Sequence, residues 1–176
     1  MRGVLPKHSA VHLDASGGFL VASPCRGPVA GGFFLADLAN FFSHSKTYFL
    51  AIEKLFLDVL ESMKAAHYGR IINIISTSVK VPLKGLGVSN TIRGAVASWA
   101  KTMSIEVAPF GITVNNVLPG FTDSLDLPQK FADMSVFKRL ATSKEQAKAA
   151  TFLLTQDSSY ITGQSIRSDG GVTRHM

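Results

Sequence analysis

The sequence has 176 residues, a length typical of one domain. Hydrophobic residues make up 46% and charged residues 17%, which excludes a disordered chain. The 18 Lys and Arg outnumber the 12 Asp and Glu, but they are spread along the chain, so we expect no nucleic-acid partner. No stretch approaches the ~20 consecutive apolar residues of a membrane span, so we expect no membrane partner.

The chain contains a single cysteine, Cys25. One cysteine excludes an intrachain disulfide and a cysteine-based zinc site. We therefore expect no structural metal and a cytoplasmic location, where thiols stay reduced.

The first part of the chain predicts little regular structure. Residues 1–18 show no sustained hydrophobic period and are expected to form an irregular lead-in. Residues 19–22 are a short apolar run that ends at Ser23-Pro24, and this pattern predicts a buried strand. Residues 27–32 are rich in glycine and predict a loop.

Helices and strands then alternate. Residues 47–66 and 90–107 repeat apolar side chains every three or four positions, which predicts two amphipathic helices. Residues 71–75 and 112–118 are β-branched runs without a helical period, as expected for strands buried on both faces.

The last elements repeat this order. Residues 144–155 predict a helix, and residues 164–167 predict a short strand. Strands that alternate with helices in this way predict a parallel sheet.

Three segments give the chain a resemblance to the short-chain dehydrogenase/reductase family, a Rossmann-type family of NAD(P)-dependent oxidoreductases. They are Gly-Arg-Ile-Ile-Asn-Ile at 69–74, Ile-Thr-Val-Asn-Asn-Val-Leu-Pro-Gly at 112–120, and Tyr-Ile-Thr-Gly-Gln at 160–164, which leads to Asp-Gly-Gly at 169–171. They occur in the family's order and at its spacing. The resemblance implies a doubly wound parallel sheet in three α/β/α layers over residues 19–176, lacking the family's N-terminal strands.

The resemblance also implies where the catalytic residues stand. In that family a tyrosine exchanges a proton with the substrate oxygen, and a lysine four residues later holds the cofactor ribose and lowers the tyrosine pKa. Here Ser89 occupies the tyrosine position and Arg93 the lysine position. A serine hydroxyl has no accessible pKa for this role. Arg93 stays a permanent cation, which either binds a ribose or phosphate or simply faces solvent.

Two further positions follow from the same resemblance. Ser76 lies 13 residues before Ser89, where the family places its substrate-orienting serine, although a serine at a strand end also caps backbone. Tyr48 stands at the position of the family's relay asparagine. It either supplies a phenol from a new direction or packs in the core.

The resemblance implies a nicotinamide site at the turn after residues 112–118. The family's Pro-Gly turn carries hydroxyls two and four residues beyond the glycine. Here the turn is Pro119-Gly120, and those hydroxyls belong to Thr122 and Ser124. A plain turn between a strand and a loop is the alternative interpretation.

The family's glycine-rich turn, whose amides hold the cofactor pyrophosphate, has no clear counterpart. Residues 26–32 are either a degenerate form of that turn or, as the gap-free alignment favours, the loop after the family's fourth strand. On both interpretations the first two crossover units are absent. Residues 19–22 are then expected to form an unpaired, apolar edge strand that invites a partner.

The resemblance implies an oxidoreductase that transfers hydride between NAD(P) and a small-molecule carbonyl or alcohol, and we expect its activity to be impaired in this shortened chain with its substituted motif. The alternative is a catalytically degenerate pseudoenzyme that acts as an oligomerising or regulatory subunit. The family packs the helices at 47–66 and 90–107 of two subunits together, so we expect a homo-oligomer.

Overall fold

The computed structural model describes residues 10–13, 19–23, 49–123 and 127–174. Its strands are β1 (Ala10–Leu13), β2 (Phe19–Ser23), β3 (Gly69–Ile74), β4 (Ile112–Pro119) and β5 (Ser165–Ser168). Its α-helices are α2 (Ala51–Ala66), α3 (Gly87–Val107), α4 (Gln129–Met134) and α5 (Ser143–Leu154). Short 3-10 helices cover Thr77–Val79, Ala108–Phe110 and Gln156–Ser158.

The strands form one sheet in the order β1-β2-β3-β4-β5. Strands β2 to β5 are parallel, and β1 is antiparallel to β2. In the central pair, Ile71 of β3 lies opposite Val114 of β4. The parallel sheet predicted from the alternating pattern is therefore confirmed.

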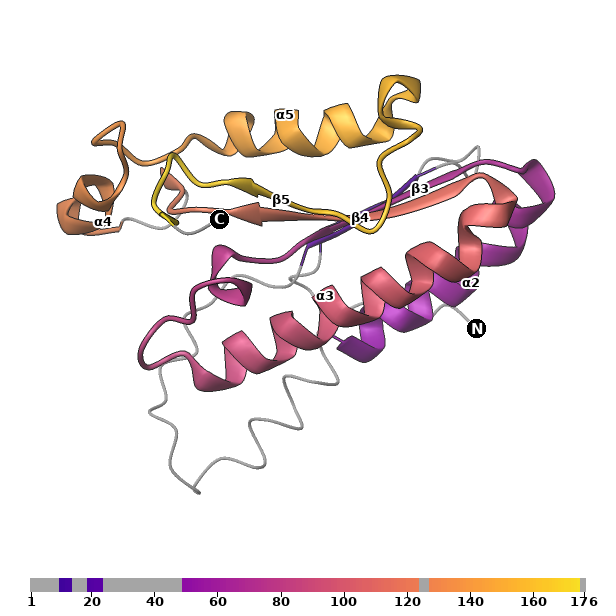
Figure 1. Cartoon of the computed structure of the whole chain (residues 1–176), viewed down its shortest axis with the longest axis horizontal. Coiled ribbons are helices and arrows are strands. Elements are labelled where there is room, and N and C mark those ends of the chain that lie inside the picture. Colours follow the sequence, from indigo (N-terminus) through magenta and orange to yellow (C-terminus); the bar gives the residue numbers. More distant parts are fainter. Residues whose placement is uncertain (1–9, 14–18, 24–48, 124–126, 175–176) are drawn as a thin grey trace.

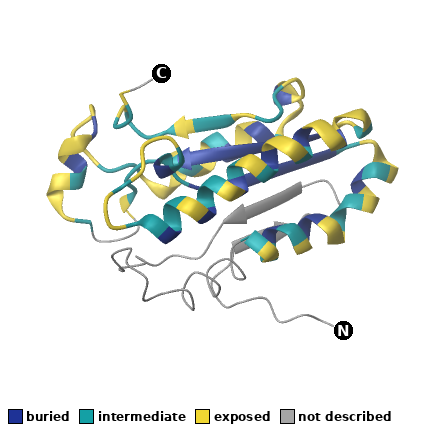
Figure 2. Ribbon diagram, turned by 60° about the horizontal axis from the view of Figure 1, so that its bottom comes forward, coloured by how far each residue is buried: buried dark blue, intermediate teal, exposed yellow. Residues whose placement is uncertain are grey.

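Helices cover both faces of this sheet, with α2 and α3 on one side and α5 on the other (Figure 1). Ile71 and Val114 pack in a cluster with residues of α2 and α3. Ile72 and Val117 point to the opposite face and pack in a cluster with residues of α5. Figure 2 shows β3 and β4 buried between these layers. A strand with helices on both faces must be apolar on both faces, which explains the β-branched runs.

The predicted boundaries of the two long helices shift by a few residues. Helix α2 begins at Ala51, and Phe49 and Leu50 before it form a wider turn. Helix α3 begins at Gly87, before the predicted residue 90, because the Asn90 amide already donates to the Leu86 carbonyl at 2.8 Å.

Two expectations for the first part of the chain are wrong. Ala10–Leu13 lie inside the segment expected to be an irregular lead-in, yet they form strand β1. Strand β1 pairs with β2 and places Val11 opposite Ala22, so β2 is not an unpaired edge. The physical reason is that the backbone groups of a strand need partners, and preceding residues of the same chain supply them here.

Candidate functional site

The candidate site lies at the carboxyl ends of β3 and β4, the edge where α/β proteins bind ligands. Strand β3 ends at Ile74, and Ser76 follows as the N-cap of the turn at Thr77–Val79. The Ser76 hydroxyl accepts a hydrogen bond from the Ser78 amide at 3.1 Å. The capping role that the sequence left open is therefore present, and the half-buried Ser76 side chain stands at the predicted edge.

Helix α3 carries Ser89 and Arg93 one turn apart in its N-terminal half. The Arg93 Nε donates to the Ser89 hydroxyl at 3.1 Å, and the Arg93 Nη1 donates to the Ile75 carbonyl at 2.7 Å. Ile75 directly precedes Ser76 in the chain. One guanidinium thus joins the first turns of α3 to the end of β3 and brings three predicted catalytic positions to one edge. The fourth, Tyr48, lies outside the described residues.

This arrangement binds oxygen atoms better than it moves protons. A guanidinium keeps its charge at any physiological pH, and its planar fork of N–H donors suits hydroxyl and phosphate oxygens. Ser89 and Ser76 add hydroxyls to the same edge, but a serine hydroxyl does not ionise near neutral pH. The three side chains can therefore orient an oxygen and stabilise negative charge on it.

The predicted nicotinamide turn is a tightly packed corner. The Gly120 amide donates to the Ser168 carbonyl of β5 at 3.0 Å, and the Thr122 hydroxyl donates to the Gly120 carbonyl at 3.2 Å. A Cβ at Gly120 would lie 2.7 Å from the Cα of Asp169, so packing alone requires glycine here. Pro119 is the last residue of β4, and Gly120 and Thr122 follow it, whereas Ser124 lies outside the described residues.

Two side chains at this edge, those of Arg93 and Thr122, carry hydrogen-bond donors of the kinds that bind ribose and phosphate oxygens. Arg93 and Thr122 are half-buried, and they stand after neighbouring parallel strands. A cation and a hydroxyl in that place are the kinds of group that bind ribose hydroxyls and phosphate oxygens. Residues 26–32, the alternative glycine-rich turn, lie outside the described residues.

Two sets of contacts were not predicted from the sequence, those of Arg93 with the backbone and those of Glu145. The acceptor for Arg93 is the backbone carbonyl of Ile75, for which the sequence carries no signal. The second set is that of Glu145, which accepts two hydrogen bonds from Arg139, at 2.7 and 2.9 Å, and one from the Thr142 amide at 2.8 Å. These donors, the Arg139 guanidinium first, lower the pKa of Glu145 to about 2. The Thr-x-x-Glu spacing of residues 142–145 is a capping-box pattern. It could have predicted the contacts of Glu145 with Thr142, but not its ion pair with Arg139.

Known proteins similar to this chain include several oxidoreductases. The NADPH-dependent reductase BacG of Bacillus subtilis (strain 168) is 34% identical over 127 residues, which cover 62% of this chain and 49% of that protein. The 3-oxoacyl-[acyl-carrier-protein] reductase FabG of Haemophilus influenzae (strain ATCC 51907 / DSM 11121 / KW20 / Rd) is 34% identical over 140 residues, 76% of this chain and 58% of that protein. The chain thus spans about half the length of the curated relatives it matches.

A solved structure agrees with these matches. The crystal structure of YwfH, an NADPH-dependent reductase involved in bacilysin biosynthesis, superposes with a TM-score of 0.77 at 27% sequence identity. The superposition covers 89% of this chain and 67% of that one. The family model described as enoyl-(acyl carrier protein) reductase matches residues 35–173, well over half of the sequence. With the fold and the ordered motifs, this match shows that the chain belongs to the short-chain dehydrogenase/reductase family.

Proposed function

We propose that this chain works as an NAD(P)-dependent oxidoreductase on a small-molecule carbonyl or alcohol, with proton transfer weakened by its substituted motif. The observation that carries the proposal is the Arg93 guanidinium, which joins Ser89 to the end of β3 beside Ser76. The similarity to BacG, FabG and YwfH, all named as reductases, supports the class of reaction.

The proposal assigns a role to each described residue at this edge. Ser76 and Ser89 orient the substrate oxygen, and Arg93 stabilises negative charge on it. Pro119, Gly120 and Thr122 form the wall against which the nicotinamide lies. A bound nicotinamide would supply or accept the hydride. The family's phenol is replaced by Ser89, so the proton must come from water or from a residue outside this group.

A second candidate function is that of a pseudoenzyme, an oligomerising or regulatory subunit without turnover. The same contacts favour it in another way: two donors of Arg93 already bond within the chain, to Ser89 and to Ile75. If those bonds persist, Arg93 is a structural strut that fixes α3 to β3. The two candidates differ in whether the edge binds a nicotinamide.

The proposal includes self-association through α2 and α3. Leu57 of α2 and Ile105 of α3 are 59% and 69% exposed, large apolar side chains that a second subunit would cover. Light scattering at micromolar concentration tests this directly, since a monodisperse monomer would contradict it. A cytoplasmic location also stays a proposal. In the described part of the chain, no helix combines the length and apolarity needed to cross a membrane.

The deciding experiment titrates the purified chain with NADPH and NADH and follows both Trp99 fluorescence and the melting temperature. We expect saturable binding that Arg93→Ala weakens about 10-fold, because charge-assisted hydrogen bonds to the cofactor are lost. Lys148→Ala, which removes one exposed cation of α5, is the matched control and should bind as the unmodified chain does.

Turnover then separates the two candidates. NADPH oxidation is measured with a panel of ketones, for the unmodified chain and for the Ser89→Tyr, Arg93→Lys double variant. General acid-base catalysis is worth ~10² to 10⁴-fold, so a slow unmodified chain and a faster double variant support the oxidoreductase. Absence of binding by either nicotinamide contradicts it and leaves the pseudoenzyme.

A further inference from the structure

The order of the strands limits what the carboxyl edge of this sheet can bind. A dinucleotide lies across the point where the strand order of a doubly wound sheet reverses, and each side of that point holds one mononucleotide half. The described strands follow one another as β1-β2-β3-β4-β5, with no reversal among them. The parallel strands β2 to β5 therefore correspond to one side of such a sheet, and the candidate site lies at their carboxyl ends.

Strand β1 fills the position where the second side would begin. It lies beside β2, on the side away from β3. Ala10 lies opposite Ser23 and Leu13 opposite Leu20, so β1 begins at the carboxyl edge and ends at the other edge. A turn that binds pyrophosphate follows the carboxyl end of a parallel strand and opens a helix, whose N-terminal amides hold the anion. An antiparallel strand in this position ends at the wrong edge for such a turn.

A glycine-rich turn does follow β5, but amides of this turn are already engaged. Asp169, Gly170 and Gly171 come directly after the strand. The Asp169 carboxylate accepts hydrogen bonds from the amides of Gly171 and Thr173, each at 3.0 Å. Successive backbone amides of this kind are what an anion binds in a phosphate-binding turn. The turn after β5 therefore binds its own carboxylate in the place of a phosphate.

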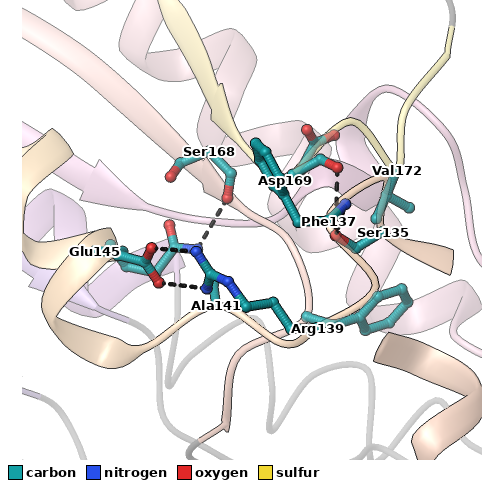
Figure 3. A pocket seen from close by; sticks show the side chains of 11 residues that line it. Ser135, Phe137, Arg139, Ala141, Glu145, Ser168, Asp169 and Val172 are labelled. Atoms are coloured by element: carbon teal, nitrogen blue, oxygen red, sulfur yellow. Dashed lines mark hydrogen bonds and ion pairs between the residues drawn. The ribbon is translucent and has the colours of Figure 1, made fainter. Parts of the chain in front are cut away.

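The surroundings of this turn are equally unsuited to a pyrophosphate. Figure 3 shows the small cavity beside it, with a volume of about 130 Å³. The carboxylates of Asp169 and Glu145 and the guanidinium of Arg139 line this cavity. Arg139 donates to Glu145 at 2.7 and 2.9 Å, so its charge is already paired. A pyrophosphate placed here would meet the remaining negative charge of Asp169, which is unfavourable.

We propose that this chain recognises a nicotinamide mononucleotide, and that the AMP half of NADH or NADPH adds little to binding. The inference rests on the proposed function, because it takes from there the nicotinamide wall at Pro119, Gly120 and Thr122. It goes further by naming the part of the cofactor that is bound. The mononucleotide contains the reactive ring, a ribose and a phosphate, and the half-buried Arg93 and Thr122 carry donors that suit the last two groups.

The test compares reduced nicotinamide mononucleotide with NADH, by isothermal titration calorimetry of the purified chain. A protein that holds both halves of a linked ligand gains ~10² to 10⁴-fold in affinity from the link. Here only one half is held, so the two dissociation constants should agree within about 5-fold. AMP alone should neither bind nor displace NADH.

NMR of the ¹⁵N-labelled chain locates the two ligands. The backbone amides of Ser76, Ser89 and Thr122 should shift alike with the mononucleotide and with NADH, since both ligands present the same half. Ala10 and Ser23 lie at the carboxyl edge where β1 and β2 pair. Their amides should shift no further with NADH than with the mononucleotide.

A variant checks that both ligands use the same residues. Arg93→Ala should weaken the mononucleotide and NADH by the same factor, about 10-fold, because charge-assisted hydrogen bonds are lost equally to both. Lys148→Ala, which removes an exposed cation of α5, is the matched control and should leave both affinities unchanged.

The results that would overturn this inference differ from those that would overturn the proposed function. An advantage of NADH larger than about 5-fold, or displacement of NADH by AMP, would show that the AMP half is held, and the oxidoreductase function would stand. Shifts at Ala10 or Ser23 that only NADH produces would have the same meaning. Absence of binding by both ligands would contradict the proposed function itself, and this inference with it.

Discussion

Strand β4 and the first turns of α3 belong to one fold, but their residues are constrained to very different degrees. Val114, Val117 and Leu118 of β4 are fully buried between helices on two faces. Ser89 and Arg93 of α3 are half-buried and bond to each other and to one carbonyl. A change in the strand must be accommodated by neighbours on all sides, whereas a change at the edge alters a few hydrogen bonds. The family fold can therefore persist while its chemistry changes.

The sharpest test of this comparison is a large-to-small change in β4. Leu118→Ala should lower the free energy of unfolding by about 2–5 kcal/mol, because it removes apolar contacts and leaves a cavity among Ile52, Ile75 and Val96. Urea unfolding followed by circular dichroism measures the change. Leu57→Ala, at an exposed leucine of α2, should stay within about 0.5 kcal/mol. Equal effects of the two variants would contradict the contrast.

Two glycines sharpen the comparison, Gly94 inside α3 and Gly111 after the short 3-10 helix that follows it. Gly111 follows the helix with φ of +71°, and a Cβ there would lie 2.5 Å from the His67 carbonyl oxygen, so Gly111→Ala should cost more than about 1 kcal/mol. Gly94 lies in the helix next to Arg93, and a Cβ there meets nothing within 4 Å. Gly94→Ala should raise stability by about 0.5–1 kcal/mol. If Gly94→Ala also lowered stability, the surroundings of Gly94 would be as tightly packed as those of Gly111, and the contrast would fail.

This contrast also explains how far the sequence alone predicts the fold. The helices α2, α3 and α5 can be predicted from the three- and four-residue spacing of their apolar side chains, because each buries one face. The strands β3 and β4 can be predicted from their β-branched apolar runs, because both of their faces are buried. Strand β1 was missed because Ala10–Leu13 are only four residues long, too few to establish a period.

The polar contacts inside the sheet needed the structure. Asn73 donates to Asn116 at 3.1 Å, and Asn116 donates to Ser165 at 3.1 Å, across three neighbouring strands. The sequence shows three polar residues in separate segments, and only the register of the strands brings them together. The same holds at the candidate site. The resemblance to the family implies that Ser76, Ser89 and Arg93 belong to one site, but their hydrogen bonds depend on three-dimensional placement.

A smaller loss of stability is expected when Arg93, at the carboxyl-end edge of the sheet, is substituted. Arg93→Ala removes the donors to Ile75 and Ser89 and should lower the free energy of unfolding by about 1 kcal/mol, since the site is half-buried and water replaces part of the loss. Arg93→Lys keeps the charge but loses the planar fork, and should recover less than half of that loss. A loss as large as that of Leu118→Ala would place Arg93 in the structural core and favour the pseudoenzyme.

The smallest effect concerns the ion pair at the start of α5. Hydrogen bonds from Arg139 and Thr142 hold the folded-state pKa of Glu145 at about 2, below its ordinary value of 4.5. A lowered folded-state pKa means that the contribution of Glu145 to stability is complete above about pH 4.5, declines as the pH falls towards 2, and is absent below. We therefore expect Glu145→Gln to flatten the pH dependence of the unfolding free energy within this window. Arg139→Ala should reproduce most of that flattening because it removes the largest cause of the shift.

Both side chains are exposed, at 54% for Arg139 and 43% for Glu145, so solvent screens the pair and the change in slope should be slight and weaker in high salt. An unchanged slope in both variants would show that the pair contributes nothing to stability, while a steep change would make this surface corner as consequential as the buried strand.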